Sequence, residues 1–250
     1  MTESLAISLD TDFHVHSTHS RDGLSTLKEN VAQSAAVGLT TVRLVEHVRA
    51  STTWVPEFVA AVGALKRPYG LMMLTGVEAT ILDLSGRLDV PRDLVIGRTG
   101  VDRILLADHR FPGPDGPWSA ATTRSRLAAG LATADAIDML VLAMTRAMRL
   151  VGNGQLAHPF SILPKIGLAE SDLRNDHLAA VATAASVTGT LVEVNEKLQC
   201  PGIKAIQAFV AAGATMVPAS DSSHCGGIGQ YTFVRRMVRA EVEVRAALTG

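Results

Sequence analysis

The sequence is poor in cysteine. It contains only Cys200 and Cys225, and these two are not in the C-x-x-C spacing of a thiolate metal site. Such a pair indicates neither a disulfide framework nor a cysteine-based zinc site. A metal ion bound by this chain would therefore be held by nitrogen and oxygen ligands.

An excess of charge and a long apolar run are also missing. The chain has 23 Lys and Arg against 24 Asp and Glu, a net charge of -1, whereas a nucleic-acid binder usually carries a basic stripe. No apolar run reaches the ~18 residues of a membrane span, and residues 1–10 lack a signal-peptide pattern. We expect a cytoplasmic protein with no membrane or nucleic-acid partner, and we leave the oligomeric state open.

What is present is a regular alternation of short and long segments. Runs rich in Val, Ile, Leu and Thr alternate with Ala-rich segments of helical period, which predicts repeated βα units. With 250 residues, the chain suits one domain, residues 1–250, folded as a nearly closed parallel barrel. Strands are expected at 10–16, 40–46, 71–79, 103–109, 154–158, 190–195 and 215–221. Helices are expected at 26–37, 56–66, 120–150 (with a break near Gly130 left open), 170–186, 201–212 and 232–248.

One stretch, residues 83–117, departs from this alternation because it is rich in Gly, Pro, Asp and Arg. Insertions of this kind often cover an active site. We expect it to shape a substrate pocket with Phe111 and Trp118, although Trp118 could equally cover the core.

Side chains that can bind metal ions follow nearly every expected strand. His14 and His16 are two residues apart, so in a strand they face the same side and can address one ion. The other such side chains are His47, Glu78, His109, His158 and Asp221, followed by His224. A single histidine near a strand end is usually structural, and we interpret His19 and His177 in that way, although His19, in the loop after the first strand, could also lie near the substrate. Six of the eight histidines at the ends of barrel strands instead predict one metal centre.

The run Asp12-Phe-His-Val-His-Ser-Thr-His-Ser-Arg-Asp-Gly23 resembles the opening motif of the PHP (polymerase and histidinol phosphatase) superfamily. Later landmarks in the same order are Glu46-His47, Gly76-Val-Glu78, Ala107-Asp-His109, Ala157-His-Pro159, Glu193-Val-Asn195 and Ser220-Asp221. The resemblance covers about residues 10–230. It implies an α/β fold, a distorted (β/α)7 TIM-like barrel with a metal site at the C-terminal ends of the strands.

The resemblance also implies which residues hold the ions. A first ion would be bound by His14, His16, Glu78 and Asp221, a second by Glu78, His109 and His158, and a third by Asp22, His47 and His224. The expected cofactors are thus two or three divalent ions, of Mn, Fe or Zn, all of which accept such ligands.

Two departures from the family pattern affect this assignment. Glu46 stands where the family usually has Asp, and Asp221-Ser-Ser-His224 has one residue more than the family's Ser-Asp-Ala-His. In an extended segment an added residue turns the side chain to the other face unless a bulge absorbs it. The third site is the one that this insertion puts in question.

The implied activity is hydrolysis of small-molecule phosphate monoesters by a metal-activated hydroxide, as in histidinol phosphatases. Proton transfer would be handled by metal-bound water or Asp221, with His224 also a catalytic candidate. Arg110 and Lys197 follow strands and could bind the phosphate, although each could be a surface charge. Arg21 is a third candidate.

Three alternatives remain. A phosphodiesterase, nucleotidase or cyclic-phosphate hydrolase could use the same centre, but it should carry aromatic residues beside the metals, and only 4% of the residues are aromatic. A C–N hydrolase usually adds a strand-borne lysine, which the strand at 103–109 lacks. A non-catalytic barrel would hold a full set of polar ligands without metal, at considerable cost.

Overall fold

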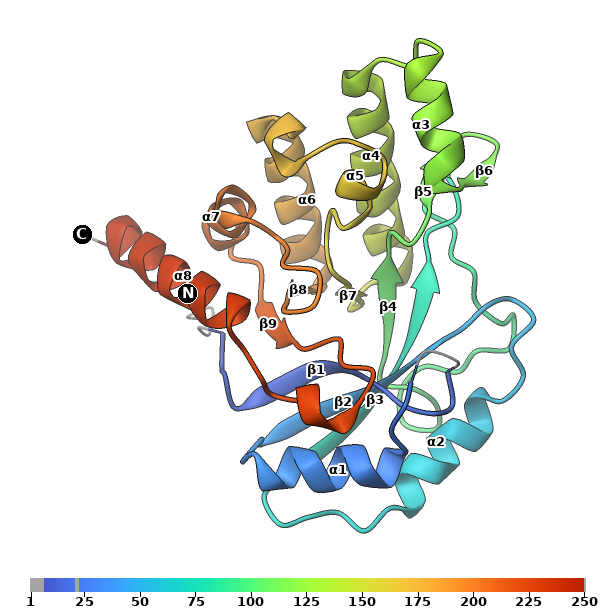
Figure 1. Cartoon of the computed structure of the whole chain (residues 1–250), viewed down its shortest axis with the longest axis vertical. Coiled ribbons are helices and arrows are strands. Elements are labelled where there is room, and N and C mark those ends of the chain that lie inside the picture. The colour runs from blue at the N-terminus through green and yellow to red at the C-terminus, as the bar shows by residue number, and fades with distance from the viewer. Residues whose placement is uncertain (1–6, 21–22, 250) are drawn as a thin grey trace.

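Seven parallel strands form the centre of the protein (Figure 1). The computed structural model describes residues 7–20 and 23–249. The strands occur in chain order around one sheet, and every neighbouring pair is parallel. They are β1 (Thr11–His16), β2 (Thr41–His47), β3 (Met72–Thr80), β4 (Arg103–Ala107), β7 (Gln155–Leu156), β8 (Leu191–Asn195) and β9 (Met216–Ala219). The predicted α/β barrel is confirmed.

The barrel closes between β1 and the segment that follows β9. Val15 and Ser222 form a parallel bridge, and the His16 N–H donates to the Ser222 carbonyl at 3.0 Å. The Asp12 carboxylate is fully buried at this junction, where it accepts backbone N–H groups of Ser220 at 2.9 Å and Gly229 at 3.0 Å. Burial raises the pKa of Asp12 to about 6, against the opposing effect of these hydrogen bonds.

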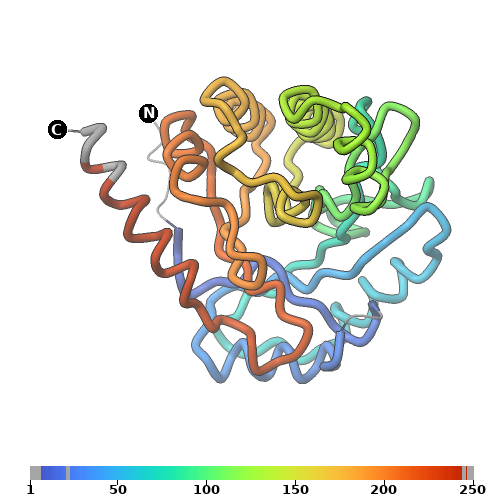
Figure 2. The backbone as a smooth tube through the Cα atoms, turned by 45° about the horizontal axis from the view of Figure 1, so that its top comes forward, coloured from blue at the N-terminus to red at the C-terminus, as the bar shows by residue number. Residues whose placement is uncertain are grey.

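Helices cover the outside of the sheet. They are α1 (Leu27–Ala36), α2 (Val55–Ala64), α3 (Ala120–Ala128), α4 (Thr133–Val151), α5 (Ile162–Lys165), α6 (Asn175–Thr188), α7 (Ile203–Ala211) and α8 (Phe233–Thr249), with short 3-10 turns η1 (Glu170–Asp172) and η2 (Cys225–Gly227). In Figure 2, α4, α6 and α7 lie side by side, and α1 and α2 lie on the opposite side of the molecule. None of the helices in the described part of the chain is long and apolar enough to cross a membrane.

Some expected boundaries were left open or were wrong. The break near Gly130, which was left open, is present: residues 120–150 form two helices, because Gly130 between them has a φ of +108° that a helix does not allow. The helix expected at 170–186 is the turn η1 followed by α6. The insertion contains an unpredicted hairpin of β5 (Phe111–Gly113) and β6 (Gly116–Trp118).

Phe111 and Trp118 from this hairpin stack on each other with ring centroids 5.6 Å apart, and both are buried in the hydrophobic core. The simpler role considered for Trp118, covering the core, is therefore the one that the structure supports. The hairpin anchors the insertion beside the barrel rather than supplying aromatic rings to a pocket.

Replacing Asp12 with Ala should destabilise the barrel at its closing junction. Three backbone N–H groups, those of His14, Ser220 and Gly229, would lose their buried acceptor, so we expect the free energy of unfolding to fall by about 2–4 kcal/mol. Urea denaturation in the presence of a chelator measures this without a contribution from bound metal. Asp10→Ala, at an exposed position, is the matched control and should change stability by less than ~0.5 kcal/mol. Equal losses in the two variants would contradict this role of Asp12.

Candidate metal centre

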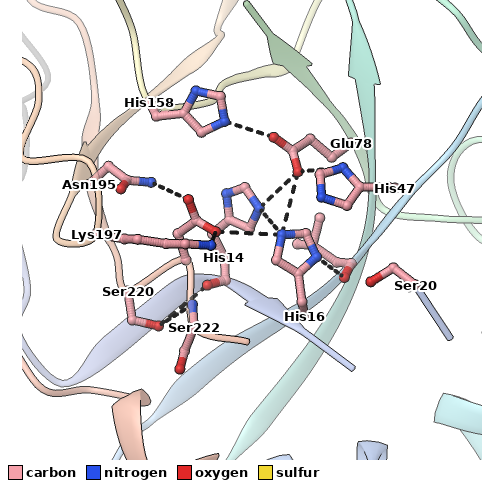
Figure 3. Close-up of polar contacts among 12 residues, drawn as sticks. His14, His16, Ser20, His47, Glu78, His158, Asn195, Lys197, Ser220 and Ser222 are labelled. Carbon is pink, nitrogen blue, oxygen red and sulfur yellow. Dashed lines mark hydrogen bonds and ion pairs between the residues drawn. The ribbon is translucent and has the colours of Figure 1, made fainter. Parts of the chain in front are cut away.

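The side chains expected to bind metal come together at the C-terminal end of the barrel. His14 and His16 are on β1, His47 ends β2 and Glu78 is near the end of β3. His109, His158 and Asp221 lie two residues beyond the last residues of β4, β7 and β9. Parallel strands deliver these residues to one mouth, and Figure 3 shows His14, His16, His47 and His158 gathered around Glu78.

Glu78 is the centre of the cluster. Its Oε1 lies 2.9 Å from His109 Nε2 and 2.8 Å from His158 Nε2. Its Oε2 lies 3.3 Å from His14 Nε2, 3.5 Å from His16 Nε2 and 3.1 Å from His47 Nδ1. The Glu78 side chain is fully buried, and no donor among the described residues makes a hydrogen bond to Oε2.

The ring nitrogens of His14 and His16 show why these contacts are not ordinary hydrogen bonds. His14 Nδ1 lies 2.8 Å from Glu193 Oε1, and His16 Nδ1 lies 3.0 Å from the Val45 carbonyl. Both partners only accept, so each Nδ1 carries the proton. In the neutral rings the two Nε2 lone pairs then face each other across 3.0 Å. A cation between them would remove this repulsion.

His158 is oriented in the same way by a second carboxylate. Ser161 Oγ donates to Asp108 Oδ1 at 2.6 Å, so this hydroxyl can accept a proton from His158 Nδ1, which lies 3.0 Å away. The Nε2 lone pair of His158 is thereby directed at Glu78 Oε1. Metal-bound histidines commonly have such a partner on the other ring nitrogen.

Three groups of side chains place ligand atoms within 4.8 Å of one another, as a shared divalent ion requires. They are His14, His16 and Asp221; His16, His47 and Glu78; and Glu78, His109 and His158. Imidazole nitrogens and carboxylate oxygens gathered in this way fit divalent cations with nitrogen and oxygen ligands.

Without a cation, the charges of the cluster shift in the direction expected for this environment. Burial lowers the pKa of His158, but Asp108 and Glu78 outweigh it and raise the pKa to about 10. Burial raises the pKa of Glu78, but His109 and His14 hold it well below its usual value. The site favours positive charge around an ionised carboxylate.

Two of the candidate ligands have a left-handed backbone. The φ angle is +30° at His158 and +52° at Asp221. This region is unfavourable for residues other than glycine and is found most often at functional sites. The turns at these residues end β7 and β9 early, which explains why both strands are shorter than expected.

The remaining candidate site residues are not all found at the cluster. Arg21 and Asp22 lie outside the described residues. His224 is exposed, and its Nδ1 accepts the Gly226 N–H at 3.1 Å. His47 groups with His16 and Glu78. Because the chain turns at Asp221, the argument from an extended segment does not apply there, and binding of a third ion by His224 stays a prediction.

Two cations that were expected to bind phosphate lie beside the cluster. Lys197 Nζ is 3.1 Å from Asp221 Oδ1, and its side chain is 49% exposed. Arg110 is exposed and lines a cavity of about 840 Å³ that opens onto His47, Glu78 and His109. Both can therefore reach a ligand at the cluster.

The far wall of this cavity adds residues that the sequence had not indicated. Arg49, Trp54 and Asp89 line it, together with His19. The ring of His19 lies 6.1 Å from that of Trp54, centroid to centroid. His177 instead lies in α6, where its Nε2 is 2.6 Å from Asp138 Oδ1, in agreement with a structural role.

The residues that orient the ligands were missed. Glu193 and Asp108 hold His14 and His158, and the Glu46 carboxylate accepts the backbone N–H groups of Ser17 at 3.1 Å and Ser20 at 2.6 Å. Glu193 and Asp108 stand in the landmarks Glu193-Val-Asn195 and Ala107-Asp-His109, so carboxylates within these strand-end landmarks were the available signal.

Glu78→Gln should dismantle the cluster, because a neutral amide cannot bridge ions between five histidines. We expect loss of at least one metal equivalent and a drop of about 100-fold or more in any metal-dependent activity. Atomic absorption of the purified protein measures the metal content. Glu170→Gln, which changes a partly buried Glu bonded to the Gly202 N–H, is the control. Full metal content in Glu78→Gln would exclude a bridging role.

Comparison with known proteins finds a partial sequence match and a shared fold. No family model matches the chain. A protein of Clostridium novyi (strain NT) named as a probable phosphatase is 32% identical over 88 residues, which is 34% of this chain and 35% of that protein. The match thus spans about a third of the length of that relative.

Two solved structures share the whole barrel. One is a histidinol phosphate phosphatase of Lactococcus lactis subsp. lactis Il1403, complexed with Zn, L-histidinol and phosphate, with a TM-score of 0.62, 12% identity, and coverage of 94% of this chain and 91% of that one. The other, from Listeria monocytogenes and assigned as a histidinol phosphatase, has a TM-score of 0.60, 13% identity, and coverage of 88% and 97%. At these identities the likeness shows a common TIM-like α/β fold.

Proposed function

We propose that this protein is a metal-dependent hydrolase of small-molecule phosphate monoesters and a member of the PHP superfamily. The observation that carries the proposal is the buried Glu78 carboxylate with five imidazole nitrogens directed at it. The ordered motifs, the barrel shared with histidinol phosphatases and the partial match to a phosphatase all support it.

Divalent cations held by these ligands would lower the pKa of bound water and polarise the phosphoryl oxygens. The chain's own residues would hold the substrate. Lys197 pairs with a candidate metal ligand and Arg110 lines the cavity that contains Glu78, so each is a candidate to bind a non-bridging oxygen of the phosphate. Asp221 pairs with Lys197 at 3.1 Å, which aligns the ammonium group with the cluster.

An aromatic residue in the cavity wall favours keeping a second candidate function, that of a diesterase or nucleotidase. A diesterase or nucleotidase was expected to show aromatic residues beside the metals, and Trp54 lies in the wall of the cavity that also contains Glu78. One face of Trp54 packs on the core. Its presence at the cavity is an argument for a ring-bearing substrate, and thus for a nucleotide among the possible esters.

Turnover of p-nitrophenyl phosphate should depend on metal. The protein loaded with Mn, Fe or Zn is expected to release phosphate, a chelator should abolish release, and added metal should restore it. Chelation removes the groups that activate water, so the loss should be at least about 100-fold. Bis(p-nitrophenyl) phosphate, assayed in parallel, separates the two candidates. Faster turnover of the diester would favour the second candidate, and metal binding without either activity would reject a phosphoesterase.

Lys197→Met should weaken the use of phosphate substrates without removing metal. The variant loses one charge-assisted hydrogen bond to the phosphate, so kcat/KM should fall by about 10- to 100-fold. Lys204→Met, at an exposed position on α7, is the matched control and should leave kcat/KM unchanged. Steady-state kinetics with metal analysis of each variant measure both effects. An unchanged kcat/KM in Lys197→Met would leave this lysine as a surface charge.

A further inference from the structure

A buried cation lies on the strand that carries His47, outside the set of metal ligands. Arg43 on β2 is only 2% exposed. Its Nη1 donates to Gln155 Oε1, and its Cζ lies 5.1 Å from the centroid of the Phe13 ring. Within the described chain no carboxylate is within ion-pair distance of Arg43, and its Nε has no hydrogen-bond partner. Burying a cation without a paired charge is costly, so packing alone does not explain this arginine.

Hydrogen bonds lead from Arg43 to the metal centre. Gln155 on β7 is fully buried, and its Nε2 donates to Glu193 Oε1 at 2.7 Å and to the Phe13 carbonyl at 2.9 Å. Glu193 Oε1 also lies 2.8 Å from His14 Nδ1. The cation is therefore connected to a candidate metal ligand through one amide and one carboxylate.

The chemistry of the partners leaves Gln155 a single orientation. The guanidinium of Arg43 only donates, whereas the Phe13 carbonyl and the Glu193 carboxylate only accept. If the amide were reversed, its oxygen would face Glu193 and its NH2 group would face Arg43. The guanidinium thus ensures that Glu193 receives a hydrogen bond and remains an acceptor for His14.

The space for this arginine is provided by Gly76 on β3. A Cβ atom at Gly76 would lie 3.1 Å from Arg43 Cδ and 2.8 Å from Leu105 Cδ1. Gly76 stands two residues before Glu78, in the Gly76-Val-Glu78 landmark. The strand that carries the central carboxylate therefore also leaves room for the buried cation beneath it.

We propose that Arg43 is a positioning residue of the metal centre. Acting through Gln155 and Glu193, it keeps the Nδ1 proton on His14 and so presents the Nε2 lone pair to the ion. This role rests on the proposed function only in requiring a metal centre, whatever the substrate is. Partners of metal-bound histidines usually contribute about 10- to 100-fold to metal affinity.

The experiment compares zinc affinity in variants of the full chain. The Zn²⁺ dissociation constant is measured by competition with a chromophoric chelator in Arg43→Met, Arg43→Lys and Arg103→Met. Arg103 is a half-buried arginine at the start of β4 that donates to the carbonyls of Asn153 and Gly154, with no hydrogen bond to Gln155 or Glu193. We expect zinc binding to weaken by about 10- to 100-fold in Arg43→Met, to recover in Arg43→Lys and to be unchanged in Arg103→Met.

A second readout reports the histidine directly. In the zinc-bound protein, where the metal takes the place of any Nε2 proton, the NMR signal of the His14 Nδ1–H should show a hydrogen bond to Glu193 in the wild type and a weaker one in Arg43→Met. If Arg43→Met does not fold, Gln155→Met removes the same connection while leaving the arginine, and it should weaken zinc binding by a similar factor.

Two results would overturn the proposal. One is wild-type zinc affinity and an unchanged His14 Nδ1–H signal in zinc-bound Arg43→Met. The other is an equal loss of zinc affinity in Arg43→Met and Arg103→Met, which would indicate a merely structural role. A wild-type protein that binds no zinc would reject the metal centre itself. A wild type that binds zinc but releases no phosphate would reject only the phosphatase, and the variants would still decide the role of Arg43.

Discussion

The arrangement around Glu78 is the constraint on which the rest of the site depends. Its carboxylate is buried, and the imidazoles of His14 and His16 face it with Nε2, the nitrogen that carries no proton when the ring is neutral. His14 donates a hydrogen bond from Nδ1 to Glu193, and His16 donates one from Nδ1 to the Val45 carbonyl. The result is a set of lone pairs and negative oxygens facing one another, which is stable only when positive charge lies between them. The barrel serves to hold this arrangement together.

The way in which the strands end follows from this requirement. Within a strand, alternate side chains already point to one face of the sheet, whereas ligands beyond a strand end need a turn of the chain to face the same centre. His158 and Asp221 meet this need with φ angles of +30° and +52°, directly after short strands. Such conformations are unfavourable by about 1–3 kcal/mol each and persist when their surroundings over-determine them. At His158, the N–H donated to Glu193 at 3.0 Å is part of those surroundings.

Much of the fold and of the metal cluster could be predicted from the sequence, because the signals for them are local. Periodicity revealed the seven strands, and the spacing of His14 and His16 indicated a shared face, because both signals are local. Gly130 indicated a possible break in the Ala-rich segment without deciding it, and the hairpin from Phe111 to Trp118 was not indicated at all. Both depend on tertiary packing and turn geometry, which hydrophobic periodicity does not report. Arg43 illustrates the limit most clearly. Nothing near it in sequence indicates a buried cation, since its partner Gln155 is 112 residues away.

The same electrostatics imply that metal and protons compete for this site. In the absence of a cation, burial lowers the pKa of His14, but Glu193 and Glu78 raise it well above its ordinary value. The pKa of His158 is raised to about 10 by Asp108 and Glu78, against the effect of burial. At neutral pH the metal-free cluster therefore holds protons that an incoming ion must displace, and metal affinity should increase with pH over the range in which those protons are lost. Glu193 contributes to both states, because the carboxylate that raises the proton affinity of His14 also increases the basicity of its Nε2 toward a metal. Glu193 thus makes His14 a stronger metal ligand and also stabilises the protonated, metal-free cluster. Arg43, which is connected to Glu193 through Gln155, offsets part of the negative charge of this carboxylate.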